Sequence, residues 1–160
     1  MKQNKRAYLA ISVICYFLFV SGTFVSALDG GFVGLGGEAN GNSKEKPAAG
    51  GILTMGLDIN SFFAVGLKNA VSFSFEDLIV LENAAFFRYY PIKNMGLFLQ
   101  ADLGATVLFE NEKAKPVFLG GLLVGWRFNF GKFFYLEPSA RGGYPFIWGA
   151  GLTAGVKIKS

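Results

Sequence analysis

Apolar and polar residues alternate strictly along residues 95–109, which read M-G-L-F-L-Q-A-D-L-G-A-T-V-L-F. Every second residue from Leu97 to Phe109 is apolar, whereas the intervening row from Gly96 to Thr106 is small, polar or charged apart from Phe98. Period two is typical of a β-strand, because successive side chains point to opposite faces of a sheet. The alternation alone does not decide whether the apolar row faces a protein core or lipid.

The same alternation recurs along the rest of the chain and predicts eight strands. They cover residues 30–38, 50–59, 62–68 (with an extension to 75), 78–90, 95–109, 117–130, 133–141 and 148–158. Short connections are predicted near Asn60, at 91–94 and near Gly131, and longer or more polar ones at 39–49, 69–77, 110–116 and 142–147. An even number of strands, with short turns at one end and longer loops at the other, is the layout of an outer-membrane β-barrel.

Charged side chains gather on one face of the predicted strands. Five acids and five bases share this face: Glu38, Asp58, Glu82, Asp102, Glu137, Lys68, Arg88, Arg127, Arg141 and Lys157. A soluble lipocalin-like barrel would show the reverse arrangement, with charges outside and apolar side chains inside. In a membrane, a charge that faces hydrocarbon costs up to about 2–4 kcal/mol, so charges turn inward and pair. The pattern therefore predicts a lumen filled by a structural network of salt bridges.

Aromatic residues cluster near the ends of the predicted strands. Such clustering is typical of the two aromatic girdles that flank the apolar band of a membrane barrel. The residues predicted for the girdles are Phe63, Phe87, Tyr89, Trp126, Phe128, Phe130, Phe134, Phe146 and Trp148.

Composition agrees with an apolar exterior. Hydrophobic residues make up 52% of the chain and charged residues 16%, against about a quarter charged in a typical soluble domain. No window after residue 27 supplies the roughly 20 apolar residues of a membrane helix. Without Lys2, Lys5 and Arg6 the chain keeps 12 basic and 11 acidic residues, a balance that argues against nucleic-acid binding.

Residues 1–27 read as a signal peptide, and residues 28–160 as the barrel domain. A basic start precedes an apolar run at 7–20, and small residues at 25–27 fit cleavage after Ala27. The alternative is an uncleaved anchor, because residues 7–28 are long enough to span a bilayer. Cys15 is the single cysteine, so a cleaved chain can form neither a disulfide nor a thiolate metal site.

The sequence predicts no enzyme. Glu82, Asp102 and Glu137 could serve as acid–base pairs, but salt bridges that fill a narrow lumen explain them better. There is no histidine, which excludes a histidine–serine acyl hydrolase. The glycines at 34–37 and 149–151 lack the strand–loop–helix context of a phosphate site and read as space for larger neighbours. No catalytic, cofactor or metal site is predicted.

The eight segments and the closing stretch R-G-G-Y-P-F-I-W-G-A-G-L-T-A-G-V-K-I at 141–158 resemble small bacterial outer-membrane barrels such as the OmpA transmembrane domain and OmpX- and OmpW-like proteins. The resemblance implies an all-β, eight-stranded, antiparallel up-and-down transmembrane barrel in the outer membrane. It also implies a monomer whose partners are outer-membrane lipid and the outer-membrane assembly machinery, with a surface or periplasmic protein as a further partner.

Three functions remain open at this point. The first is a non-enzymatic barrel with a structural or surface-interaction role, and its exposed contact residues would be Lys44, Glu45, Lys46, Glu112, Lys113 and Lys115. The second is a narrow pore or conduit for small apolar molecules, and the third is a soluble secreted ligand-binding barrel. If the apolar row of 95–109 faces lipid, Leu103→Arg should block insertion and Gly104→Ser should be tolerated.

Overall fold

The computed structural model describes residues 30–41, 47–74, 79–110 and 113–158. The predicted signal peptide lies outside these ranges. The strands are β1 (Gly31–Gly41), β2 (Ala48–Asp58), β3 (Phe63–Ser74), β4 (Ile79–Tyr89), β5 (Leu97–Glu110), β6 (Lys113–Trp126), β7 (Phe128–Phe130), β8 (Phe134–Tyr144) and β9 (Trp148–Ile158). Among the residues described, no helix is long and apolar enough to cross a membrane.

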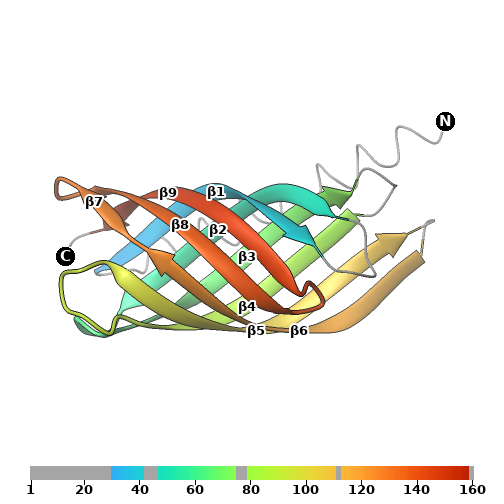
Figure 1. Ribbon diagram of the computed structural model, residues 1–160, viewed down its shortest axis with the longest axis horizontal. Helices are drawn as coiled ribbons and strands as arrows, with labels where there is room; N and C mark the ends of the chain where they lie inside the picture. The colour runs from blue at the N-terminus through green and yellow to red at the C-terminus, as the bar shows by residue number, and fades with distance from the viewer. Residues whose placement is uncertain (1–29, 42–46, 75–78, 111–112, 159–160) are drawn as a thin grey trace.

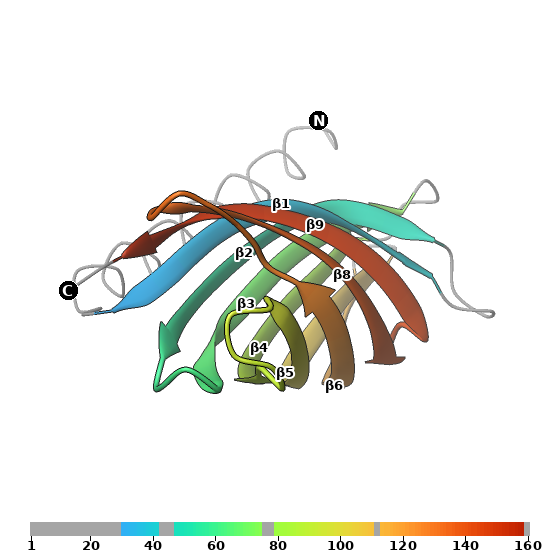
Figure 2. The same cartoon turned by 60° about the vertical axis from the view of Figure 1, so that its left-hand side comes forward.

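The strands form a closed antiparallel barrel. Consecutive strands pair from β1 to β6, β8 pairs with β9, and β9 returns to pair with β1. The sheet closes because β6 also pairs with β8; Figure 2 shows β6 and β8 coming side by side as the sheet curves. In Figure 1 the β4–β5 and β7–β8 connections lie at the left and the β8–β9 hairpin at the right. We call the end of the barrel with the β4–β5 and β7–β8 connections the turn end, and the end with the β8–β9 hairpin the loop end.

Strands β6 and β7 together act as one strand, the sixth of eight along the chain. The sequence predicts one strand over 117–130, and the register of β8 runs on unchanged, from Gly125↔Ser139 to Phe128↔Leu136. Continuing that register places Trp126 opposite Pro138, which has no N–H to donate to the ladder. The interruption of the ladder therefore coincides with a proline and leaves an up-and-down barrel of eight strands.

The apolar row of β5 faces outward and its polar row faces inward. Leu103 is 62% exposed, whereas Asp102 is 4% exposed and Thr106 is fully buried. The same division appears on β1 and β6, where Leu35 and Leu122 are exposed outside and Glu38 is buried inside. The direction predicted for residues 95–109 is confirmed: the apolar rows form the outer wall of the barrel.

The connections predicted at 39–49, 69–77, 110–116 and 142–147 are all shorter than expected because the strands continue into them, and the third strand extends to 74 as its predicted extension allows. Residues 69–74 belong to β3 and residues 113–116 to β6, so the β5–β6 connection is only 111–112. The connection at 90–96, predicted to be short, is longer. Polar side chains such as Ser72 and Lys115 made these strand ends resemble loops, although the period-two alternation continues. The predicted difference in length between the two ends is therefore not found.

The expectation that Gly104→Ser is tolerated is also wrong. Gly104 lies on the inward row, but a Cβ at this position would overlap the carbonyl oxygen of Asn83 and lie 2.7 Å from the Cα of Ala84. These are backbone atoms of β4, the neighbouring strand, and they cannot move aside as a side-chain end can. Glycine at position 104 thus allows a close approach of β4 and β5.

We predict that Gly104→Ala destabilises the barrel by about 1–3 kcal/mol, the usual cost of overpacking. Gly51→Ala is the matched control, because the Cβ of residue 51 would meet only one atom, at 3.9 Å, and its cost should stay within about 0.5 kcal/mol. Urea unfolding of the refolded protein, followed by heat-modifiable gel mobility, measures both. Equal midpoints for the two variants would contradict the assigned packing.

Candidate functional site in the barrel lumen

Four charged residues from four strands pair near the loop end of the lumen. The ammonium of Lys68 lies 2.8 Å from Glu38 and 3.9 Å from Glu82. The guanidinium of Arg141 donates to both oxygens of Glu82, at 2.6 and 3.0 Å, and lies 3.6 Å from Glu38. Two acids and two bases thus form a neutral cluster, which we call the loop-end charge cluster.

A second group of charges lies toward the turn end. Arg88 Nη1 donates to Glu137 Oε1 at 2.8 Å, and Arg127 Nε donates to the same oxygen. All three side chains are at most 5% exposed. Two guanidinium groups on one carboxylate leave an excess of one positive charge, and we call this group the turn-end charge cluster.

A hydrogen-bonded chain links this cluster to a buried carboxylate that compensates its excess charge. Arg88 Nε donates to Gln100 Oε1 at 2.8 Å, and Gln100 Nε2 donates to Asp102 Oδ1 at 2.7 Å. Asp102 is buried, and its carboxylate balances the excess charge. The eight buried charges of the lumen therefore sum to zero, as a low-dielectric interior requires.

Aromatic rings surround the two arginines of the turn-end cluster. The Cζ atom of Arg88 lies 3.9 Å from the ring centre of Phe98, and that of Arg127 lies 4.1 Å from Phe32 and 4.6 Å from Tyr135. Cation–π attraction of this kind is worth about 2 kcal/mol or more when the partners are desolvated. Tyr90 lies beside both guanidinium groups, which oppose the rise in its pKa that burial causes.

Each inward aromatic ring of the strands faces a glycine on a neighbouring strand. The register pairs are Phe32↔Gly56, Phe86↔Gly66, Phe98↔Gly125 and Tyr135↔Gly155. A Cβ at any of these glycines would collide with the paired ring. In the sequence, Phe98 is only an exception to the polar row, and the alternation does not reveal this ring cluster. The pairing of an aromatic residue on a polar row with a small residue on the next strand is the sequence feature that indicates it.

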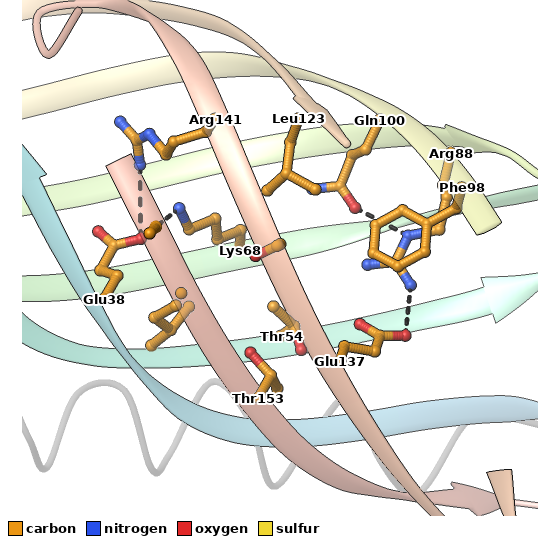
Figure 3. A pocket seen from close by; sticks show the side chains of 14 residues that line it. Glu38, Thr54, Lys68, Arg88, Phe98, Gln100, Leu123, Glu137, Arg141 and Thr153 are labelled. Atoms are coloured by element: carbon orange, nitrogen blue, oxygen red, sulfur yellow. Dashed lines mark hydrogen bonds and ion pairs between the residues drawn. The ribbon is translucent and has the colours of Figure 1, made fainter. Parts of the chain in front are cut away.

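A small cavity separates the two charge clusters. Its volume is about 20 Å³, enough for about one or two water molecules. Figure 3 shows Glu38, Lys68 and Arg141 on one side of this space and Arg88, Gln100 and Glu137 on the other, with Thr54 and Thr153 between them.

Phe146 closes the lumen at the loop end and does not belong to the outer girdle for which it was predicted. The ring is fully buried and packs with Ala48 and Val80, and Leu108 lies against this group. The 145–147 connection turns inward at this point, so the alternation that places neighbouring strand residues outside does not apply. The girdle prediction for Phe146 is therefore corrected.

The other predicted girdle residues lie on the outer wall. Phe63 stacks between Phe87 and Tyr89, at ring distances of 5.4 and 5.3 Å. Trp126 stacks on Phe128 at 6.2 Å. Phe130, Phe134 and Trp148 are more than half exposed. The first of these groups lies at the turn end and Trp148 lies at the loop end.

Two of the ten predicted lumen charges lie apart from both clusters. Asp58 is exposed and Lys157 is half-buried, and both lie at the turn-end mouth of the barrel, where β2 and β9 end. Within the part of the chain that the structure describes, no group of three or more potential metal-ligating side chains occurs.

Several solved structures share this fold. The N-terminal β-barrel domain of Pseudomonas aeruginosa OprF matches with a TM-score of 0.64 at 14% identity, over 82% of this chain and 98% of that domain. Neisserial surface protein A matches with a TM-score of 0.56 at 13% identity, over 82% and 96%. The Pseudomonas aeruginosa outer membrane protein OprG matches with a TM-score of 0.54 at 9% identity, over 83% and 98%.

These matches show that the chain has the fold of small eight-stranded outer-membrane barrels. At such low identities they show the fold alone. No protein-family model and no curated protein sequence matches the chain.

We predict that Glu137→Gln destabilises the barrel by about 3–5 kcal/mol, because Arg88 and Arg127 would then be buried without the carboxylate that pairs directly with both of them. Asp58→Asn is the control, since Asp58 is an exposed acid outside the clusters, and its effect should stay within about 0.5 kcal/mol. Denaturant unfolding in detergent micelles measures both variants. A Glu137→Gln barrel as stable as the parent would show that the turn-end cluster does not hold the lumen together.

Proposed function

We propose that this chain is a non-enzymatic, integral outer-membrane barrel that presents its connections at the membrane surface and is closed to solutes. The observation that carries the proposal is the reversed polarity of the barrel. Eight charged residues are sealed inside as a neutral network, while the outer wall is apolar, as shown by Leu103 at 62% and Leu122 at 71% exposure.

The solved structures with the same fold support this placement. OprG is an outer membrane protein and Neisserial surface protein A is a surface protein, as their names state. Every strand except β7 has 11 to 14 residues. A tilted barrel strand needs about 9–11 residues to cross a bilayer, so these strands are long enough. The exposed rings at the turn end and at the loop end fit the two membrane interfaces.

A soluble ligand-binding barrel agrees poorly with the structure. Such a barrel needs a polar outer surface and an apolar cavity large enough for a ligand. Here the wall is apolar and the cavity between the charge clusters is about 20 Å³, which is far below the roughly 300 Å³ of a small-molecule site.

A pore also agrees poorly with the structure. Arg88, Arg127 and Glu137, with the rings around them, fill the turn end of the lumen, and Phe146 fills the loop end. Both obstructions consist of buried side chains in contact with opposite walls. A passage would require breaking ion pairs in a low-dielectric interior, which is strongly unfavourable.

We predict that Leu103→Arg, at the middle of β5, costs insertion about 2–4 kcal/mol because the charge would face hydrocarbon. Ile92→Arg is the matched control: Ile92 is 51% exposed but lies in the β4–β5 connection, outside the apolar band. Outer-membrane fractionation and heat-modifiable gel mobility should show a loss of the folded form for Leu103→Arg alone. A freely soluble parent protein, folded without detergent, would contradict membrane insertion itself.

We predict that the purified barrel gives no stepwise conductance in a planar lipid bilayer, because both ends of the lumen are filled. The measurement requires protein that shows heat-modifiable mobility, so that silence is not caused by misfolding. Reproducible current steps that scale with the amount of folded barrel would favour the pore over a closed anchor.

A further inference from the structure

Two asparagines interrupt the apolar outer wall. Asn69 on β3 lies between the buried residues Lys68 and Ala70, and Asn83 on β4 lies between the buried Glu82 and Ala84. Alternation therefore directs both amides outward, and Asn83 is exposed. On the strands that the structure describes, these are the two outward carboxamides, and the other outward polar groups are Tyr and Trp residues at strand ends.

The two asparagines are direct neighbours across the β3–β4 ladder. The register pairs Asn69 with Asn83, near the middle of both strands. Each amide offers two N–H donors and an acceptor oxygen. One bond between the two amides would use a single donor and a single acceptor, so hydrogen-bonding capacity remains. In hydrocarbon no water supplies partners, so each donor or acceptor that stays unpaired costs free energy.

A second copy of this chain fits the amide pair better than an unrelated partner. All copies insert in the same orientation, so two neighbouring barrels are related by a two-fold axis along the membrane normal. Each Asn83 then meets the amide pair of its partner at the same depth. Carboxamides are self-complementary, because each one is both a donor and an acceptor.

Small side chains beside Asn83 permit a close approach of two barrels. Ala105 is its register partner on β5, and Ala85 is the next outward residue on β4. Both alanines are exposed. Small residues around a polar group are the usual composition of an intramembrane contact, since they bring the two backbones close enough for hydrogen bonding.

We infer that the barrel associates with a second copy of itself within the membrane, through the amide pair Asn69–Asn83 and the flanking alanines. The inference rests on the proposed membrane insertion and replaces the monomer that the resemblance implied. The contact lies on the β3–β5 wall, so β9, which is four strands away from β4 in either direction round the barrel, remains free.

Cysteine cross-linking in native outer membranes tests the position of this contact. Ala105→Cys, in a Cys15→Ser background, should form a disulfide-linked dimer on oxidation. Ala154→Cys on β9 is the matched control, because Ala154 is an exposed outward alanine on the opposite wall, and it should remain monomeric. Equal cross-linking at the two positions would indicate random collision and overturn the inference.

Removing the amides tests the chemistry of the contact. The double variant Asn69→Leu/Asn83→Leu keeps the wall apolar and should insert as well as the parent. Its dimerisation constant in detergent or lipid, measured by energy transfer between labelled barrels, should fall about tenfold. Leu67→Ile serves as the control on the same wall. A double variant that dimerises as strongly as the parent would overturn the role of the amides.

The same samples distinguish the two proposals. A parent barrel that fractionates with the outer membrane, shows heat-modifiable mobility and stays monomeric would overturn the dimer and leave the proposed function standing. A parent that is absent from the outer membrane would overturn both proposals.

Discussion

The cost of burying charge governs the interior of this barrel. Eight ionised side chains lie in a narrow lumen, and each one taken from water without a partner would cost several kcal/mol. The structure meets this constraint with two clusters and a connecting chain. The loop-end cluster is neutral by itself, whereas the turn-end cluster needs the carboxylate of Asp102, reached through Gln100. Strands β1, β3, β4, β5 and β8, with Arg127 between β6 and β7, contribute to this network, so it ties opposite walls of the barrel together.

Steric fit is the second constraint on the lumen. Four inward aromatic rings are each matched by a glycine on the next strand, because the ring occupies the space that a Cβ at the opposite position would need. The rings in turn shield Arg88 and Arg127 from water and contact their guanidinium faces. Charge pairing and ring packing therefore support each other at the turn end.

Because side chains occupy much of the lumen, the outer surface is the part of the barrel that is open to partners. The apolar wall, the exposed rings at its two ends and the short connections are the surfaces available for recognition. On that wall the amide pair of β3 and β4 is chemically distinct from everything around it. Under the proposed function, such a barrel acts through what its exterior contacts.

The sequence by itself determined the eight strand segments, because a period of two is a local property that each segment shows on its own. The charges gathered on one row of these strands then indicated which face turns inward. The charges of β5 and the apolar row around Leu103 could thus be assigned to opposite faces. Only the tertiary structure decided which charges pair, since Lys68 and Glu38, or Arg141 and Glu82, meet through ring closure between strands distant in sequence. The tertiary structure also placed Phe146 inside, set Asn83 beside Asn69 through the β3–β4 register and brought the backbone of β4 against Gly104. These are contacts across the sheet, and the alternation along one strand does not contain them.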